Sequence, residues 1–160
     1  MKQNEKGITI VGLIITVLVI VIIAGVCIYT GRDILEEAKL EQLKTNMLLI
    51  QAKCHSIQDK VTAKEEASYI GEKIDDTSIL AEKYGVTIQS DDNWYELSKE
   101  DVEQQEYTTK DSSNNNVTKQ GIGLGNIDVA NGDYIVNYTD GEVIYTKGYN
   151  GEFKLSDLLK

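Results

Sequence analysis

A charge-free stretch of 24 residues, residues 8–31, constrains this 160-residue chain more than any other feature. As an α-helix, its apolar part over residues 8–29 would be about 33 Å long, because a helix rises about 1.5 Å per residue. The hydrocarbon core of a bilayer is about 30 Å thick. The stretch therefore predicts a transmembrane helix over residues 8–30.

The charges on either side of this stretch predict its orientation. Lys2 and Lys6 precede it, whereas Arg32 on the other side is soon outnumbered by acidic residues. These are Asp33, Glu36, Glu37 and Glu41. Basic flanks stay in the cytoplasm, so we expect a single-pass protein of the cytoplasmic membrane with its N-terminus inside. The exported part is long enough for one small domain.

Two kinds of processing fit the stretch poorly. A secretory signal has an apolar core of about 7–15 residues followed by a small-x-small cleavage site, and the nearest candidate, residues 24–26, ends in the bulky Val26. Acylation at Cys27 would require a small residue directly before the cysteine, where Val26 stands. A plain, unprocessed anchor and cleavage ahead of the apolar run remain open.

The residues at the edge of the stretch carry a family resemblance. Lys6-Gly7 is followed directly by Ile8-Thr9-Ile10-Val11. This junction resembles the prepilin leader junction of type IV pilins and type II secretion pseudopilins. The resemblance covers about residues 1–60. It implies that residues 1–7 are a leader, that a prepilin peptidase cuts after Gly7, and that Ile8 becomes an N-methylated N-terminus. Thr9 matches the hydroxyl residue common at the next position.

The resemblance also implies a role for the apolar helix and for its partners. The mature helix would assemble with other pilin-like subunits, into a homo- or hetero-filament. The family usually has a glutamate at the fifth mature position, and here that position is Gly12. Gly12 cannot pair with the amine of a neighbouring subunit. It is compatible with a minor or tip subunit, with a divergent mode of assembly, or with close helix packing at a small residue.

The helix is expected to continue beyond the apolar stretch as an amphipathic segment over residues 31–61. Apolar residues recur there every three or four positions and form one stripe. They are Leu35, Ala38, Leu43, Met47, Ile50, Cys54, Ile57 and Val61. We expect a sheet to pack on this stripe.

Residues 62–160 are expected to form the exported globular head. Its first part predicts short helices over residues 63–73 and 78–84, the latter capped by Gly85. Residues 94–97 are apolar enough to anchor the head, and Ser98 predicts the N-cap of a further short helix. Residues 108–120 are almost wholly polar and predict a loop.

The last third of the head predicts β-structure. The turn dipeptides Asn131-Gly132, Asp140-Gly141 and Asn150-Gly151 separate segments rich in β-branched and aromatic residues. We expect strands over residues 134–138 and 142–146, with a further strand over residues 122–129. The predicted fold class is α+β: a long N-terminal helix packed by a three- or four-stranded antiparallel meander, as in pilins.

Composition and spacing indicate no catalytic constellation. The net charge of −10 and the lack of Lys and Arg clusters argue against nucleic-acid binding. Cys54 and His55 are neighbours on the predicted helix and point in different directions, so they do not form a nucleophile pair. The spacings that zinc requires are absent, and the glycines of residues 121–125 do not match a nucleotide-binding fingerprint. No cofactor or metal site is expected.

Calcium is the one ion for which candidate ligands cluster in turns. Asp91, Asp92 and Asn93 form one such group. Asp128, Asn131 and Asp133 form the other. The resemblance raises this possibility, since some pseudopilins bind calcium. The spacing does not fit the calcium-loop pattern, and turns attract Asp and Asn for backbone reasons alone.

Three functions remain open at this point. The first is a non-enzymatic subunit of a type IV pilus or type II secretion pseudopilus, which the junction favours. The second is an unprocessed single-span membrane protein whose exported head binds a ligand or partner. An enzyme comes third, because no set of acid, base, nucleophile or metal ligand stands out.

Overall fold

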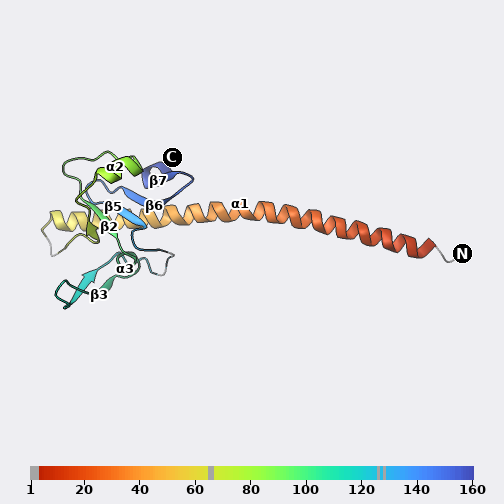
Figure 1. The fold of residues 1–160 in the computed structure, drawn as a ribbon, viewed down its shortest axis with the longest axis horizontal. Helices are drawn as coiled ribbons and strands as arrows, with labels where there is room; N and C mark the ends of the chain where they lie inside the picture. Colours follow the sequence, from red (N-terminus) through yellow and green to blue (C-terminus); the bar gives the residue numbers. More distant parts are fainter. Residues whose placement is uncertain (1–3, 65–66, 126, 128) are drawn as a thin grey trace. The chain divides into compact units, whose positions relative to one another are not determined.

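A computed structural model describes residues 4–64, 67–125, 127 and 129–160 (Figure 1), and side chains are described for these residues apart from 4–12 and 25–33. The chain divides into two compact units, Met1–Glu41 and Gln42–Lys160. One α-helix, α1 (Asn4–Thr62), contributes to both units. The α+β class with a long N-terminal helix and an antiparallel sheet is confirmed.

The bounds of α1 agree with the predicted continuous helix at its C-terminal end only. It begins at Asn4, so residues 4–7 of the expected leader are already helical. Proline, the residue that most disrupts a helix, is absent from the chain. After Thr62 the backbone of Lys64 adopts a positive φ of 58°, a conformation that ends helices. In the described residues, no helix offers an apolar stretch long enough to cross a membrane.

The prediction of a helix over residues 63–73 is wrong. Its last two residues form a short strand, β1 (Glu72–Lys73), which pairs antiparallel with β2 (Trp94–Leu97). Gly71 just before it has φ +98°, and a Cβ there would lie 2.6 Å from the Glu96 carbonyl oxygen. The chain needs this glycine to approach the neighbouring strand, and a helix could not place it there.

The main sheet has five strands in the order β1-β2-β5-β6-β7, and each neighbouring pair is antiparallel. The strands β5 (Tyr134–Asn137), β6 (Val143–Tyr149) and β7 (Glu152–Lys154) form the predicted meander. Asp140-Gly141 and Asn150-Gly151 lie in its turns. The sheet is larger than expected because β2 and β1 extend it on the other side of β5.

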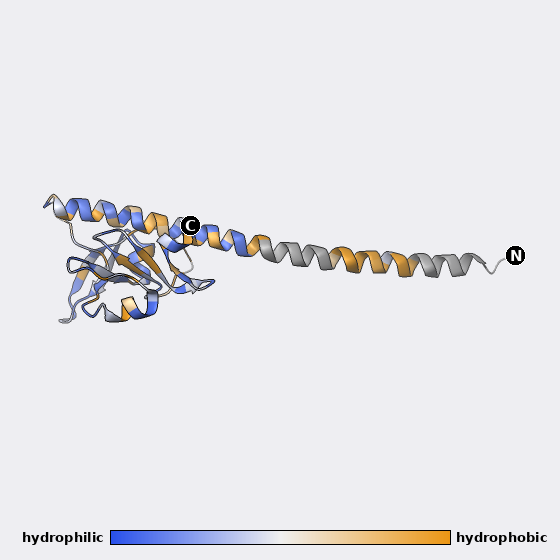
Figure 2. Cartoon of the chain, turned by 90° about the horizontal axis from the view of Figure 1, so that it is seen from above, coloured by the Kyte–Doolittle hydropathy of each residue, from blue (hydrophilic) through white to orange (hydrophobic). Residues whose placement is uncertain are grey.

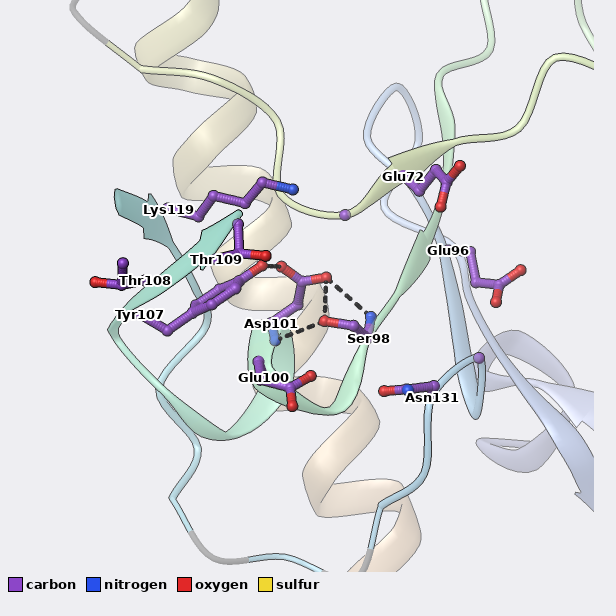
Figure 3. Close-up of a pocket in the computed structure, with 12 residues that line it drawn as sticks. Glu72, Glu96, Ser98, Glu100, Asp101, Tyr107, Thr108, Thr109, Lys119 and Asn131 are labelled. Atoms are coloured by element: carbon purple, nitrogen blue, oxygen red, sulfur yellow. Dashed lines mark hydrogen bonds between the residues drawn. The ribbon is translucent and has the colours of Figure 1, made fainter. Parts of the chain in front are cut away.

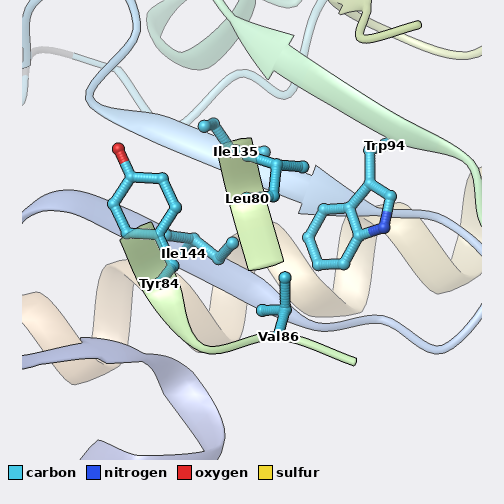
Figure 4. Packing of buried hydrophobic residues seen from close by; sticks show 6 residues of the cluster. All are labelled: Leu80, Tyr84, Val86, Trp94, Ile135 and Ile144. Carbon is cyan, nitrogen blue, oxygen red and sulfur yellow. The ribbon is translucent and has the colours of Figure 1, made fainter. Parts of the chain in front are cut away.

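Strand alternation divides the sheet's side chains between two layers. Leu80, Tyr84, Val86, Trp94, Ile135 and Ile144 form a buried cluster beneath α2 (Ser78–Tyr84), as Figure 4 shows. The alternate residues of β5, Tyr134 and Val136, point to the opposite face. All four residues of β5 are buried, as a central strand covered on both sides requires.

A second sheet, the β3–β4 hairpin, consists of β3 (Glu106–Lys110) and β4 (Asn116–Gln120) (Figure 1). The prediction of a loop over residues 108–120 is therefore wrong. The Asp111 carboxylate organises the turn by accepting hydrogen bonds from the amides of Ser113 at 2.9 Å and Asn115 at 2.8 Å. These bonds and the backbone pairing make strands from residues with no apolar pattern.

The strand expected over residues 122–129 is also not found in the described part of that segment. Its backbone instead bonds to α3 (Lys99–Glu103). The amide of Ile122 donates to the Asp101 carbonyl at 2.6 Å, and that of Leu124 donates to the Val102 carbonyl at 2.9 Å. The free carbonyls at the C-terminal end of this short helix hold the segment in place of a neighbouring strand.

The predicted helix ends within the head are confirmed. Gly85 closes α2 in the left-handed conformation, and its amide donates to the Ala81 carbonyl. Ser98 caps α3 in a reciprocal capping box with Asp101. A last short helix, α4 (Leu155–Leu158), follows β7 and was not expected.

Candidate functional site

The residues that the sequence assigns to processing and assembly all lie in the first turns of α1. They are Gly7, Ile8, Thr9 and Gly12. Their side chains lie outside the described residues, so the structure places their backbone in the helix and leaves their roles as predictions.

The described part of the apolar stretch is exposed on every side of the helix. We call its ten large aliphatic residues the apolar belt. They are Leu13, Ile14, Ile15, Val17, Leu18, Val19, Ile20, Val21, Ile22 and Ile23. Each of these side chains is 48–65% exposed, and Figure 2 shows them as a continuous hydrophobic band. A helix that is apolar all round needs an apolar environment from outside its own chain.

Thr16 interrupts the apolar belt with the one hydroxyl between residues 13 and 24. Its Oγ1 donates to the Leu13 carbonyl oxygen at 2.8 Å, one turn earlier. The hydroxyl is therefore satisfied within the helix itself. This arrangement leaves the belt with no polar side-chain group that requires water, which suits lipid or a bundle of helices.

The second part of the helix presents a different surface. Met47, Ile50, Cys54 and Ile57, which we call the buried stripe, are covered by the head. This part of the expected stripe is confirmed, whereas Leu35 is 63% exposed. Gln51 reinforces the packing because its Nε2 donates to the Gly141 carbonyl oxygen at 2.8 Å.

Cys54 and His55 point to different sides, as their adjacent positions on a helix require. Cys54 is fully buried against Tyr138, and burial raises the pKa of its thiol to about 12. A thiol with such a pKa is a poor nucleophile. His55 is exposed and lies over Gly141, whose φ of +76° and lack of a side chain leave room for the imidazole. The two side chains form no catalytic pair.

The main hollow of the head has a volume of about 480 Å³. It lies between β1, β2 and α3 on one side and the β3–β4 hairpin on the other (Figure 3). Four carboxylates and one lysine line it: Glu72, Glu96, Glu100, Asp101 and Lys119. Glu72 and Glu96 are direct cross-strand partners in the β1–β2 ladder, so like charges face each other there.

Asp101 is the buried carboxylate of this hollow, and its hydrogen bonds define its role. Its Oδ2 accepts from the Ser98 amide at 2.9 Å and from the Ser98 hydroxyl at 2.7 Å. Its Oδ1 accepts from the Tyr107 hydroxyl at 2.5 Å (Figure 3). Desolvation and this bond to Asp101 raise the pKa of Tyr107 to about 12. Both carboxylate oxygens are thus used to join α3 to the hairpin.

The residues lining the hollow include no histidine or cysteine, and the Ser98 hydroxyl is committed to the Asp101 carboxylate. A general base next to a free nucleophile is the arrangement that covalent catalysis requires, and these side chains do not provide one. Within the described residues, the arrangement supports structural anchoring of the hairpin and an acidic surface beside it.

The two candidate calcium groups use their oxygens within the protein. Asp92 Oδ2 accepts from the Gln89 amide at 2.8 Å, and Asp92 Oδ1 accepts from Asn137 Nδ2 at 2.9 Å. Asp133 Oδ2 accepts from the Ala130 amide and pairs with Lys147 Nζ at 2.8 Å. Asp128 lies outside the described residues. No three His, Cys, Asp or Glu side chains in the described part of the chain are grouped to hold a metal ion.

Comparison of the chain with protein-family models, with curated proteins and with solved structures yields no match.

Sequence reasoning missed both the β3–β4 hairpin and the hollow beside it. The pattern of residues 111–115, with Asp at its start and Asn at its end, is a signal for a side-chain-supported turn that could have indicated the hairpin. The hollow had no such signal, because its lining comes from segments between residues 71 and 132 that only folding brings together.

Proposed function

We propose that this chain is a pilin-like, non-enzymatic structural subunit of a type IV pilus or type II secretion pseudopilus. The observation that carries the proposal is the contrast along α1. The apolar belt is exposed on all sides, whereas the buried stripe further along the same helix packs against the head. Such a helix suits a subunit whose first part is embedded in lipid or in a filament core while its head remains in water.

The order of events follows from the residues at the start of the helix. The chain enters the cytoplasmic membrane with residues 8–30 spanning the bilayer and the head outside. A prepilin peptidase then removes residues 1–7, and Ile8 becomes the methylated N-terminus. Assembly moves the apolar helix from lipid into contact with the helices of other subunits, with Thr9 and Gly12 at the packed end. The processing residues come from the family resemblance, and the exposed belt supports the transfer between two apolar environments.

The test is mass spectrometry of the protein isolated from its own cells. We expect an N-methylated N-terminus at Ile8, and a Gly7→Leu variant that keeps residues 1–7. A Gly31→Leu variant is the matched control, because it makes the same change at the far end of the apolar stretch and leaves the junction intact. A full-length chain starting at residue 1 or 2 in cells with an active prepilin peptidase would refute the processing step.

A second candidate is an unprocessed single-span membrane protein whose exported head binds a partner. Gly12 is the observation that favours it, because the carboxylate usual at that position in the family is absent. The two candidates separate in sheared surface fractions. The pilin-like subunit is expected there as part of a filament, whereas the unprocessed protein stays in the membrane fraction and is indifferent to Gly7→Leu.

A further inference from the structure

The free edge of the β3–β4 hairpin has a feature that the proposed function does not use. The hairpin forms a two-stranded sheet of its own, separate from the five-stranded sheet. A two-stranded ribbon is marginally stable by itself, and a strand added to its edge strengthens it. The alternate residues Glu106, Thr108 and Lys110 of β3 are exposed.

The direction of the backbone groups follows from the hydrogen bonds at the two ends of the hairpin. The Gly121 amide donates to the Gln105 carbonyl at 2.9 Å, and the Asp111 amide donates to the Asn115 carbonyl at 3.0 Å. In an antiparallel ladder such hydrogen-bonded positions alternate. The amides and carbonyls of Glu106, Thr108 and Lys110 therefore point away from β4. Within the described residues, these outward backbone groups have no hydrogen-bond partner.

We propose that β3 pairs antiparallel with β3 of a second copy of this chain, centred on Thr108 of both copies. This register places Glu106 of each copy opposite Lys110 of the other and Thr108 opposite Thr108. The outward backbone groups of the three residues then form about six hydrogen bonds across the new edge. The two hairpins together make a four-stranded sheet, and the proposal does not depend on pilus assembly.

Charge complementarity is the reason to choose a second copy as the occupant. The sequence of β3, Glu-Tyr-Thr-Thr-Lys, has opposite charges at equal distances from its centre, so the pairing forms two cross-strand ion pairs at once. In the free chain Glu106 Oε2 accepts only a long bond from Gln120 Nε2, at 3.3 Å, and Lys110 Nζ donates to the Asn114 carbonyl at 3.1 Å. No printed ion pair in the described residues neutralises either charge.

The side chains on either side of this centre also match. Thr108 lies opposite Thr118 of β4 in its own hairpin, so the pairing creates a row of four threonines across the sheet. β-branched residues pack well in such cross-strand rows. The other edge of the hairpin offers less, because self-pairing of β4 about Thr118 places Asn116 opposite Gln120 and Lys119 opposite Val117. It brings no opposite charges together.

The same charges could serve only to protect an exposed edge from pairing, since lysine on an edge strand commonly does so. Charge reversal separates the two roles. In the full-length chain in detergent, Glu106→Lys or Lys110→Glu alone puts like charges opposite each other twice. Each is expected to weaken self-association about tenfold. Mixing the two single variants restores pairing, because one copy then carries two lysines and the other two glutamates. The double variant E106K/K110E restores it within one chain.

A spin label reports which edge pairs. Thr118→Cys is labelled in a Cys27→Ser background, where Cys54 is buried. Pairing through β3 puts the two labelled backbones three strand spacings apart, about 14 Å, whereas pairing through β4 would put them about 5 Å apart. We expect the 14 Å distance in the parent chain, in the mixture and in E106K/K110E. It should be lost in each single variant and unchanged in the control Lys119→Glu.

Three outcomes would overturn the proposal. The first is a parent chain without the 14 Å distance, and the second is the 5 Å distance in its place. The third is association that the single reversals leave unchanged, as a dimer held only by the apolar helix would show. Failure of the mixture to recover would likewise reject the register, since both variants then fold and carry complementary charges.

Discussion

The two parts of α1 share one backbone conformation and differ in how their apolar residues are distributed. In residues 13–23 nearly every side chain is aliphatic, and all ten residues of the apolar belt are exposed. In residues 42–62 the apolar residues follow the helical period, and the buried stripe lies beneath the head. Periodic apolarity lets a chain bury a helix against itself, whereas apolarity all round requires another molecule as the environment.

The largest expected difference between these two parts concerns the stability of the head. Ile50→Ala removes a fully buried side chain from the stripe and should lower the free energy of unfolding by about 2–5 kcal/mol. Leu18→Ala in the belt should change it by less than about 0.5 kcal/mol. Urea unfolding followed by the fluorescence of Trp94, the single and buried tryptophan, measures both. Equal losses would mean that the belt also packs on the head.

The second prediction tests the opposite property, the affinity of the belt for lipid. An arginine at the centre of a membrane helix costs about 2.5–3.5 kcal/mol of insertion free energy. Leu18→Arg should therefore shift protein from the membrane fraction to the soluble or degraded fraction. Leu49→Arg, at an exposed position of the second part, should leave the distribution unchanged. Equal behaviour of the two variants in cell fractionation would remove the distinction between the two surfaces.

The third prediction concerns pH and the buried thiol of the stripe. Burial raises the pKa of Cys54 from 9.0 to about 12, so the folded state holds this proton more tightly than the unfolded state. The stabilisation is complete below pH 9 and is lost as the pH rises toward 12. Between pH 9 and 10.5 the loss should be roughly 1–2 kcal/mol.

Cys54→Ala provides the control for this alkaline loss. It lowers stability at every pH by creating a cavity, but it should remove the part of the slope that the thiol causes. The slope that remains comes from Tyr107 and Tyr134, whose pKa values burial raises to about 12. Urea unfolding at pH 8, 9, 10 and 10.5 compares the two slopes. Identical slopes would show that Cys54 is not buried as described.

The smallest expected effect concerns the polar contact beside the stripe. Gln51→Ala removes the hydrogen bond to the Gly141 carbonyl and should destabilise the head by about 0.5–1.5 kcal/mol. Gln42→Ala is the matched control, because Gln42 is an exposed glutamine on the same helix. Its removal should leave the unfolding midpoint in urea within error of the parent. A larger effect at Gln42 would place the head's packing surface further along α1 than the buried stripe.

Local patterns were sufficient where neighbouring residues settle the conformation. The Ser98 capping box, the Gly85 cap and the strands on either side of Asp140-Gly141 followed from the sequence, because each depends on contacts within a few residues. The same holds for the helical period that placed Met47, Ile50, Cys54 and Ile57 on one face. Leu35 belongs to that period and is exposed all the same, because period defines a face and not what covers it.

The sequence by itself determined a long proline-free helix, an apolar first part with a charge-flanked edge, and a head with β-hairpins. Only the tertiary structure decided that Gly71 brings a fifth strand to the sheet, that residues 106–120 pair as a hairpin, and that Asp101 joins this hairpin to α3 through Tyr107. The physical reason is range. Caps, turns and helical period act between near neighbours, whereas these three features depend on backbone and side-chain bonds between residues that only the folded chain brings together.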